Sequence, residues 1–282
     1  MPRMLALPLE LLLGKSPDAA TAVNTTTTDD ILDRWLAAAS ERYLADLTMP
    51  ELTRALRALS SCYVERRSQL ASGQALASAG KRAAFALFYA PLHFITVDRI
   101  ARELLHGDDE PSEESRLSRI TLDLGCGTGA AGAAWALATG AARVEGYDIN
   151  PWAAREARWS YHAIGLKGST HRVPIDQVRW RKGPADMIAA FVLNELADET
   201  REAVRPALLQ AARDGHRVLL VEPIARGAAR WWADWHREAL IEGGRADEWR
   251  FRVELPELLG RLDQAAGLDH RELTARSLAL GF

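Results

Sequence analysis

The sequence predicts an α/β protein with a mostly parallel sheet and helices on both faces, preceded by a helical N-terminal region. From residue 120 onward, short apolar runs alternate with stretches of helical periodicity, which is the order of a parallel sheet. Before residue 106 the periodicity is helical only. The chain has 282 residues, 48% of them hydrophobic, so it can bury a large core and exceeds one domain of ~150 residues.

The helical region is predicted over residues 29–106. Its first helix is expected to start at a cap formed by Asp29 or Asp30, and its second helix at a cap formed by Thr48. A third, longer helix contains Pro91. Because proline lacks the backbone N–H and clashes with the preceding turn, we expect a kink or a break there.

Two segments flank this helical region. Residues 14–28 have no periodic apolar face, and the segment 1–28 is predicted to be flexible. An apolar run near the start is interrupted by Glu10 and is too short for a signal peptide. Residues 107–117 are acidic and contain proline, which predicts a linker into a cofactor-binding domain at 118–282.

The most informative segment reads ITLDLGCGTGAAG and covers residues 120–132. An apolar run ends in Asp123 and breaks into Gly125, Gly127 and Gly129 before an alanine-rich helix. Glycine permits left-handed backbone angles and lets a ligand approach the backbone closely. The segment therefore predicts a strand, a tight turn and a helix that hold a small cofactor by the backbone.

Two classes of cofactor bind such a turn. Gly127, Gly129 and Gly132 fit the GxGxxG pattern of dinucleotide sites. Asp123 favours a cationic amino-acid group instead, because its carboxylate would repel a pyrophosphate. S-adenosylmethionine carries such a cation. Asp148 ends the next apolar run, where an acid accepts hydrogen bonds from ribose hydroxyls in either class.

With these motifs the chain resembles the class I S-adenosylmethionine-dependent methyltransferases, whose first motif reads D/E-x-G-x-G-x-G and whose second motif ends in an acid. The match covers roughly residues 119–220. The resemblance implies a Rossmann-like methyltransferase fold and an enzyme that uses S-adenosylmethionine as methyl donor. It also implies that Asp123 and the turn hold the methionine part, Asp148 the ribose and Ile149 one face of the adenine. The cofactor-binding residues so predicted are Asp123, Gly125, Cys126, Gly127, Gly129, Asp148, Ile149 and Asn194.

The remaining elements follow from apolar runs and caps. Asn150 followed by a proline predicts a capped helix after the second strand. Later strands are expected near 170–173 and at 186–193, 217–222 and 272–280, with a helix at 198–213. The partner of the last strand is left open, with 249–253 as the candidate.

Three polar residues follow the fourth and fifth strands, at the sheet edge where ligands bind. Asn194 is expected to bond the target atom, and Glu195 to take a proton or position an amine. Glu222 is expected to brace the same pocket. The alternative for Glu195 is a cap or an ion pair at the next helix. The chain lacks the D/N-P-P-F/Y motif of enzymes that methylate exocyclic amines of bases.

A second resemblance rests on the runs ALRALSSCYVERRSQL and AAFALFYAPLHFITVDRIARELL, on LNEL at 193–196 and on VEP at 221–223. Together they resemble the ribosomal small-subunit methyltransferase-like family, best known from mitochondrial ribosome assembly. This resemblance implies action on ribosomal RNA or in assembly of the small subunit. Two alternatives stay open: a small-molecule methyltransferase, and a non-catalytic assembly factor that binds the cofactor.

The stretch 224–256 departs from the mitochondrial pattern. The mitochondrial relatives carry cysteines after the fifth strand that can hold a metal cluster, whereas this stretch has none, so no cluster is expected. It is instead rich in tryptophan. An aromatic wall at the substrate mouth and a helix face packed on the domain are both possible for these side chains. They are Trp231, Trp232, Trp235, His236 and Trp249.

Composition and charge exclude several classes of function. The formal charge is −3, so there is no overall polycation for nucleic acid. Residues 50–102 nevertheless hold eight Arg and Lys against three acids, which predicts either a local basic surface or solvated helix faces. Two cysteines and scattered histidines give no metal or disulfide pattern; Cys126 and His93 are expected to pack in the interior. With no long uncharged apolar stretch, we expect a cytoplasmic protein with no membrane partner.

Overall fold

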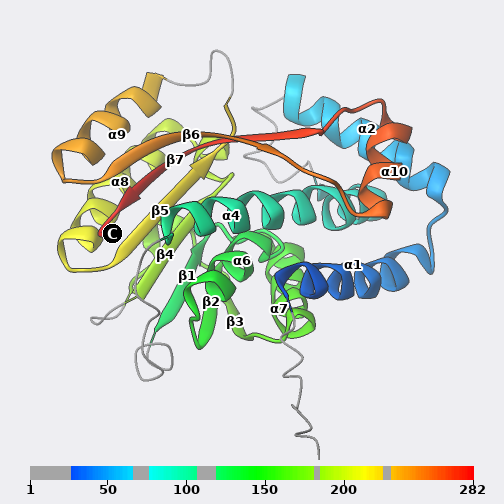
Figure 1. The fold of residues 1–282 in the computed structure, drawn as a ribbon, viewed down its shortest axis with the longest axis horizontal. Helices are drawn as coiled ribbons and strands as arrows, with labels where there is room; N and C mark the ends of the chain where they lie inside the picture. The colour runs from blue at the N-terminus through cyan, green and yellow to red at the C-terminus, as the bar shows by residue number, and fades with distance from the viewer. Residues whose placement is uncertain (1–26, 66–75, 107–118, 181–184, 225–229) are drawn as a thin grey trace, which may run out of the picture.

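The computed structural model describes residues 27–65, 76–106, 119–180, 185–224 and 230–282. A seven-stranded sheet with helices on both faces forms the centre of the molecule (Figure 1), which confirms the predicted fold class. The predicted acidic linker at 107–117 and nearly all of the predicted flexible segment at 1–28 lie outside the described residues.

The strand order of the sheet is β3-β2-β1-β4-β5-β7-β6. The first five of these strands are parallel, and β7 is antiparallel to both β5 and β6. The strands are β1 Ile120–Leu124, β2 Arg143–Tyr147, β3 Lys167–His171, β4 Ala185–Ala190, β5 Arg217–Glu222, β6 Arg245–Arg252 and β7 Glu272–Leu280. The candidate at 249–253 is therefore part of the partner of the last strand.

Two strand predictions need correction. The third strand is Lys167–His171 and not 170–173, because its ladder follows β2 and ends where His171 pairs with Tyr147. The fourth strand stops at Ala190 and not at residue 193. Phe191 takes a positive φ of 59°, which ends the extended backbone there.

Helices pack on both faces of the sheet. Before the sheet lie α1 Thr28–Leu44, α2 Met49–Glu65, α3 Ala79–Ala84 and α4 Ala90–Leu104. Between successive strands lie α6 Ala130–Thr139, α7 Pro151–Ile164, α8 Asp198–Arg213, α9 Arg230–Ile241 and α10 Glu257–Ala266. Short turns are η3 Phe85–Tyr89 (π), η4 Ile175–Gln177 and η5 Leu193–Glu195 (both 3₁₀).

The caps of α1 and α7 are formed by single side chains. Asn150 Oδ1 accepts hydrogen bonds from the backbone N–H groups of the first turn of α7, as predicted. The cap of α1 is Thr27, and the prediction of Asp29 or Asp30 was wrong. Asp30 is the third residue of the helix and closes a capping box with Thr27. Its N–H donates to Thr27 Oγ1, and its carboxylate accepts from the Thr27 N–H.

The helix that contains Pro91 is continuous from Ala79 to Leu104, and a π turn interrupts its α-helical pattern. The N–H of Ala90 donates to the carbonyl of Phe85, five residues earlier. Pro91 has no N–H to donate, and in a regular helix its ring would press on the carbonyl four residues before it. The π turn ends at Tyr89, and Pro91 lies in the first turn of α4, where proline is tolerated. The predicted kink or break therefore takes the form of a π turn.

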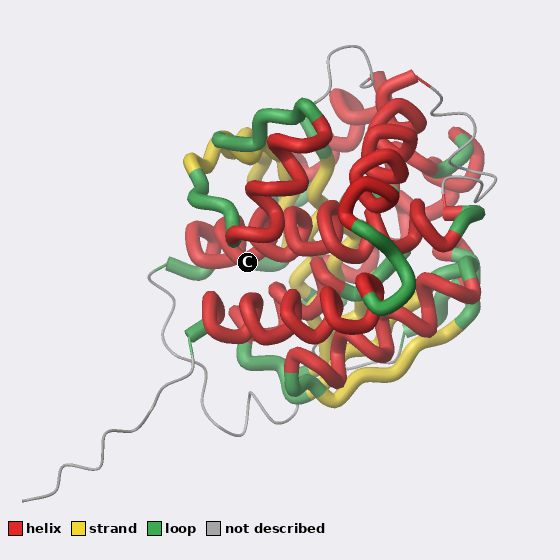
Figure 2. The backbone as a smooth tube through the Cα atoms, turned by 90° about the vertical axis from the view of Figure 1, so that its right-hand side faces the viewer, coloured by secondary structure: helices red, strands yellow, loops and turns green. Residues whose placement is uncertain are grey.

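The hydrophobic core divides into two clusters, one on each face of the sheet. Along β4, Met187 and Ala189 point into one cluster, and Ile188 and Ala190 into the other, as the period of two requires. One cluster is closed by α8 and α9, and the other by α6, α7, α10 and the N-terminal helices. Figure 2 looks onto this helical side, with the strands behind it. The helices before residue 106 therefore share their core with the sheet.

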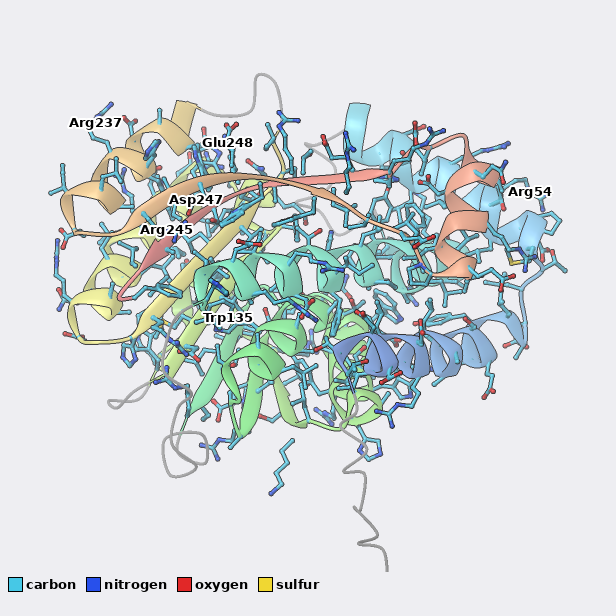
Figure 3. The ribbon with its side chains drawn as sticks, in the orientation of Figure 1. Arg54, Trp135, Arg237, Arg245, Asp247 and Glu248 are labelled. Atoms are coloured by element: carbon cyan, nitrogen blue, oxygen red, sulfur yellow. The ribbon has the colours of Figure 1, made fainter. Side chains whose placement is uncertain are left out.

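The outer edge strand β6 carries a series of charged side chains. Arg245, Asp247 and Glu248 follow one another along it (Figure 3), and Arg245 pairs with Asp247 at 2.8 Å. Charged side chains on an exposed edge disfavour pairing with a strand of another molecule.

Among the described helices, one is long and apolar enough to cross a membrane, namely Ala79–Leu104. Its most apolar window is 83% buried inside the molecule, as expected for a core helix.

Candidate functional site

The glycine turn after β1 has three left-handed residues, and each meets a different environment. Gly125, Gly127 and Gly129 have φ values of 69°, 51° and 79°. A Cβ on Gly125 would lie 2.3 Å from Val192, and one on Gly129 would lie 2.7 Å from Tyr161. A Cβ on Gly127 would meet nothing within 4 Å. The outer two glycines are therefore required for packing, whereas the middle one faces open space.

Asp123 is almost fully buried at the end of β1. Its Oδ2 accepts hydrogen bonds from Tyr161 Oη at 3.1 Å and from the Gly132 N–H at 3.2 Å. Its Oδ1 accepts no hydrogen bond from the described residues. Burial raises the pKa of Asp123 to about 7, which the bonds from Tyr161 and Gly132 only partly offset. One carboxylate oxygen is fixed by the protein, and the other is left for a ligand.

The close approach of Asp123 also explains Gly132. A Cβ on Gly132 would lie 2.3 Å from Asp123 Oδ2. The third glycine of the GxGxxG pattern is thus required by a carboxylate of the same chain. This observation favours the S-adenosylmethionine interpretation of the turn over the dinucleotide one.

Asp148 follows β2 and is tied to the glycine turn. Its Oδ2 accepts from the Gly127 N–H at 2.9 Å, and its Oδ1 from the Asn150 N–H at 2.7 Å. Each oxygen keeps a second lone pair, so the carboxylate can still accept two hydroxyl groups. Burial raises the pKa of Asp148 as well. The neighbouring Ile149 is 60% exposed, which is unusual for an isoleucine and suits a residue that covers an apolar ring.

Cys126 is buried inside the turn, as predicted. Its backbone N–H donates to the Tyr147 carbonyl at 3.0 Å. Burial, followed by the charges of Asp123 and Asp148, raises the pKa of the thiol well above its usual range. A neutral, buried thiol is a packing group and a poor nucleophile.

The end of β4 leads into the 3₁₀ turn η5, which carries Leu193, Asn194 and Glu195. Glu222, at the end of β5, is fully buried and accepts hydrogen bonds from this turn. Its Oε1 accepts from the Leu193 N–H at 2.7 Å, and its Oε2 accepts from Asn194 Nδ2 at 2.6 Å. Burial raises the pKa of Glu222 to about 7, while these donors and Arg276 lower it. Glu222 thus fixes the position of the turn that carries Asn194 and Glu195.

Both polar atoms of the Asn194 side-chain amide form hydrogen bonds. While Nδ2 donates to Glu222, Oδ1 accepts from Trp231 Nε1 at 3.2 Å. Nδ2 has a second hydrogen, which is the group left for a target atom. Asn194 therefore links α9 to β5 at the predicted catalytic turn.

Glu195 is partly exposed and differs from Asn194 and Glu222 in its hydrogen bonding. Its carboxyl group accepts no hydrogen bond from any residue in the described part of the chain. Burial raises the pKa of Glu195 to about 8, with further contributions from the charges of Glu222 and Asp148. The charges of Glu222 and Asp148 therefore act on Glu195 in the same direction as burial. The alternative role of Glu195 as an ion-pair partner or a cap of α8 has no support, since the described residues offer it no such contact.

The tryptophans of 224–256 do not form one wall. Trp232 and Trp235 are buried against the sheet, with the Arg276 guanidinium 4.1 Å from the ring centroid of Trp232. Trp231 bonds Asn194, and Trp249 lies on β6, where its Nε1 donates to Ser277 Oγ at 2.8 Å. Packing explains most of them, and only Trp231 reaches the candidate site.

Several arginines of the predicted basic stretch are used within the molecule. Arg102 pairs with Asp98 at 2.8 Å, and Arg57 and Arg82 donate to backbone carbonyls. Arg54 and Arg99 are exposed, Arg54 on α2 at the periphery (Figure 3). Arg66 and Arg67 lie outside the described residues.

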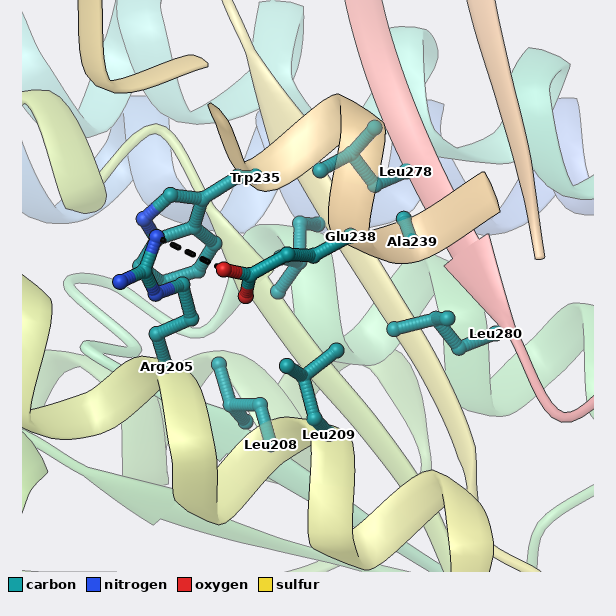
Figure 4. A pocket seen from close by; sticks show the side chains of 9 residues that line it. Arg205, Leu208, Leu209, Trp235, Glu238, Ala239, Leu278 and Leu280 are labelled. Atoms are coloured by element: carbon teal, nitrogen blue, oxygen red, sulfur yellow. Dashed lines mark ion pairs between the residues drawn. The ribbon is translucent and has the colours of Figure 1, made fainter. Parts of the chain in front are cut away.

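A recess between α8 and α9 lies apart from the candidate site (Figure 4). It is lined mainly by leucines of α8, β5 and β7, and Arg205 pairs with Glu238 across it at 3.4 Å. No residue predicted to bind the cofactor or to take part in catalysis lines it. In the described ranges, no three His, Cys, Asp or Glu side chains are grouped to hold a metal ion.

Sequence reasoning missed three residues of this region. Tyr161 supports Asp123, Phe191 turns the backbone at the end of β4, and His93 was expected in the core but lies against Phe191. Tyr161 is an ordinary apolar position of a helix in the sequence. The contacts of all three depend on tertiary structure and leave no local sequence signal.

One comparison with known proteins concerns the central part of the chain. Residues 121–215, from β1 to the turn before β5, match the family model described as a methyltransferase domain. This match agrees with S-adenosylmethionine, the cofactor that the sequence predicts. None of the curated proteins matches the chain.

Solved structures with similarity to the chain include methyltransferases of different kinds. Magnesium protoporphyrin IX methyltransferase from Synechocystis, with bound S-adenosylmethionine, is 19% identical over 67% of this chain and 79% of its own, with a TM-score of 0.43. A putative RNA methyltransferase from Pyrococcus horikoshii is 15% identical over 67% and 83%, with a TM-score of 0.41. The human methyltransferase 10 domain containing protein is 13% identical over 68% and 83%, with a TM-score of 0.45.

Proposed function

We propose that this chain is an S-adenosylmethionine-dependent methyltransferase that acts on ribosomal RNA or on the assembling small ribosomal subunit in the cytoplasm. The observation that carries the cofactor part is the arrangement of Gly127 and Asp148. The Gly127 N–H fixes the carboxylate, the space beside Gly127 is open, and an exposed isoleucine follows the carboxylate. A backbone turn, an acid and an exposed apolar side chain are what an adenosyl group needs.

The residues of the turn fit the parts of the cofactor one by one. Asp123 Oδ1 suits the amino group of the methionine part, because Oδ2 is already bonded. Asp148 suits the two ribose hydroxyls, since each oxygen keeps a lone pair. Ile149 suits one face of the adenine. When bound, S-adenosylmethionine supplies a methyl group on a positively charged sulfur that needs little activation.

The chain then has to align the acceptor and remove its proton. Unlike Asp148 and Glu222, Glu195 accepts no hydrogen bond from the described residues, which supports a role as proton acceptor. Glu222 and Asn194 hold the turn on which Glu195 sits. Alignment of the two reactants contributes most of the rate in this scheme.

Calorimetry with S-adenosylmethionine tests the cofactor part. The wild-type protein is expected to bind it, and Asp148→Ala and Asp123→Ala to bind it at least 10-fold more weakly. Exposed Glu199 provides the control variant Glu199→Ala, which should bind like the wild type. Equal affinity of all four proteins would contradict the proposal.

The proposed RNA acceptor is supported by the resemblance to the small-subunit family and by the exposed arginines of the helical region. If about four or more phosphates are contacted, affinity for small-subunit RNA falls steeply with salt concentration. Transfer of labelled methyl groups to a cell extract, separated into RNA, protein and metabolite fractions, should label RNA. Cofactor binding without any transfer would instead support the non-catalytic assembly factor.

A small-molecule acceptor is the second candidate, and one observation favours it. Glu195 and Glu222 lie at the turn assigned to the acceptor, and their carboxyl groups disfavour a phosphate close to the target atom. In this case the label appears in the metabolite fraction, and RNA binding shows little dependence on salt.

A further inference from the structure

The N-terminal helices deliver one side chain to the reacting end of the sheet. His93 of α4 stacks on Phe191, with ring centroids 4.0 Å apart and planes inclined by 17°. Phe191 directly follows β4 and lies two residues before the turn that carries Asn194 and Glu195. His93 is therefore adjacent to the place where the acceptor has to lie in the proposed function.

The backbone of Phe191 takes a costly conformation at this point. It is the only non-glycine residue with a positive φ among those that the structure describes. Its N–H still donates to the Val221 carbonyl at 2.8 Å, so the strand pairing continues up to the bend. Strain of this kind is concentrated at functional sites. At this bend the ring of Phe191 stacks on His93 of α4.

The helix that carries His93 is irregular beside the same contact. The π turn Phe85–Tyr89 ends four residues before His93, and Phe85 meets the His93 ring edge-on at a centroid distance of 5.9 Å. A π turn inserts one residue into the helix and so changes which side chains face the sheet. Such turns are frequent at functional sites.

The chemistry of His93 is not explained by packing alone. Burial lowers the pKa of His93 to about 3, so the imidazole is neutral, with one nitrogen that donates and one that accepts. Neither nitrogen is hydrogen-bonded to a residue in the described ranges, and the residue is largely but not completely buried. A phenylalanine would stack on Phe191 equally well. The ring nitrogens are thus available to a ligand.

We propose that His93 and Phe191 bind the acceptor, and that the acceptor presents a flat, uncharged heteroaromatic ring that hydrogen-bonds the imidazole of His93. This inference rests on the proposed function and names the chemical class of its acceptor. A flat ring suits the stacked pair, and a ring N–H or carbonyl complements the unbonded imidazole nitrogens. A nucleobase of RNA and a free heterocycle share this chemistry.

Nuclear magnetic resonance of protein labelled with ¹⁵N-histidine tests the proposal. The protein is saturated with S-adenosylhomocysteine, so that added nucleosides cannot enter the adenine site, and titrated with adenosine, guanosine, cytidine, uridine and quinoline. Cyclohexylamine serves as the saturated probe. At least one aromatic probe should shift the ring signals of His93, and His93→Phe should weaken its binding at least 5-fold without changing the affinity for S-adenosylhomocysteine. His162→Phe, at an exposed histidine of α7, is the matched control.

The outcomes separate this inference from the proposed function. Unchanged His93 signals with every aromatic probe, or equal binding by His93→Phe and the wild type, would overturn it. Failure to bind S-adenosylhomocysteine would contradict the proposed function instead, and the same titrations without that compound still test His93. A short single-stranded RNA that binds far more tightly than any nucleoside identifies RNA as the source of the ring; quinoline binding alone identifies a free heterocycle.

Discussion

The cofactor half of the site, formed by Asp123, the glycine turn and Asp148, is held differently from the acceptor half, formed by the turn η5, Glu222 and Trp231. In the cofactor half, the backbone N–H groups of Gly127, Gly132 and Asn150 donate to the two carboxylates, and Tyr161 Oη adds a side-chain donor to Asp123. In the acceptor half, side chains from three separate elements bond one another. The first half is therefore held mainly by backbone groups, and the second by side chains from separate elements.

This difference predicts what substitutions do in each half. Changes in the cofactor half should affect affinity for the cofactor, because they alter a preformed binding surface. Changes in the acceptor half should affect turnover, because they alter the orientation of one carboxyl group. A variant that moves both quantities together would break the comparison.

The largest effect is expected for Glu195→Gln. Loss of the proton acceptor should lower turnover by about 10²–10⁴-fold while cofactor affinity is retained. Wild-type turnover should also rise with pH, because the carboxyl group, whose pKa is about 8, acts only after losing its proton. Labelled methyl transfer between pH 6 and 9 measures both effects, with Glu199→Gln as control. Unchanged turnover would remove Glu195 from the mechanism.

Gly127→Ala should act on the cofactor half alone. Its Cβ would meet no protein atom within 4 Å and would project into the space assigned to the cofactor. We expect about 100-fold weaker binding in calorimetry, equivalent to ~3 kcal/mol. Gly165 also has a positive φ, 93° against 51° for Gly127, and equally open space outside the site, so Gly165→Ala should lose stability but not affinity. Equal affinity losses in both variants would show that backbone strain, and not blocked space, is responsible.

Trp231→Phe should have a moderate effect on the acceptor half. It removes the N–H that bonds Asn194 Oδ1 and keeps an aromatic ring in place. We expect turnover to fall about 5- to 10-fold, in line with the ~1 kcal/mol of one hydrogen bond. Affinity for S-adenosylmethionine should stay unchanged. Trp249→Phe, which removes a similar bond on β6, is the matched variant and should leave turnover as it is.

The smallest effect concerns stability against pH. The pKa values of Asp123, Glu222 and Glu195 are raised to about 7, 7 and 8, so the folded protein keeps protons that the unfolded chain releases. The stabilising contribution of these groups is full below about pH 4 and is lost as pH rises to about 8. We expect the melting temperature to fall by about 5 °C or more between pH 5 and pH 8.5.

Two variants divide this pH effect between the halves. Glu195→Gln should flatten the pH dependence of melting in the acceptor half, and Asp123→Asn in the cofactor half. A melting temperature that rises with pH in the wild type would contradict the raised pKa values.

The sequence predicted the locally encoded parts of the molecule well. The fifth strand, Arg217–Glu222, and the helix Asp198–Arg213 have the predicted bounds, because apolar periodicity and flanking polar residues define both. The cap at Asn150 and the left-handed glycines of the turn also follow from residue type. These features need only a few neighbouring residues.

The parts that sequence reasoning missed depend on contacts between distant residues. The fourth strand looked longer because its apolar run continues past Phe191, and only the tertiary structure bends the backbone there. His93 sits in an apolar helical run, where nothing marks its contact with a residue 98 positions later. The hydrogen bonds that join Asn194, Glu222 and Trp231 were therefore not predicted.

The shared core of the N-terminal helices and the sheet has a consequence for how the molecule denatures. Trp35 of α1, Leu56 of α2 and Phe94 of α4 are buried in the same cluster as Ile188 of β4 and Leu219 of β5. A chain shortened to the strand-bearing part would expose this apolar surface to water. Folding and melting should thus be cooperative over both parts, with one calorimetric transition, and a fragment from residue 118 onward should aggregate.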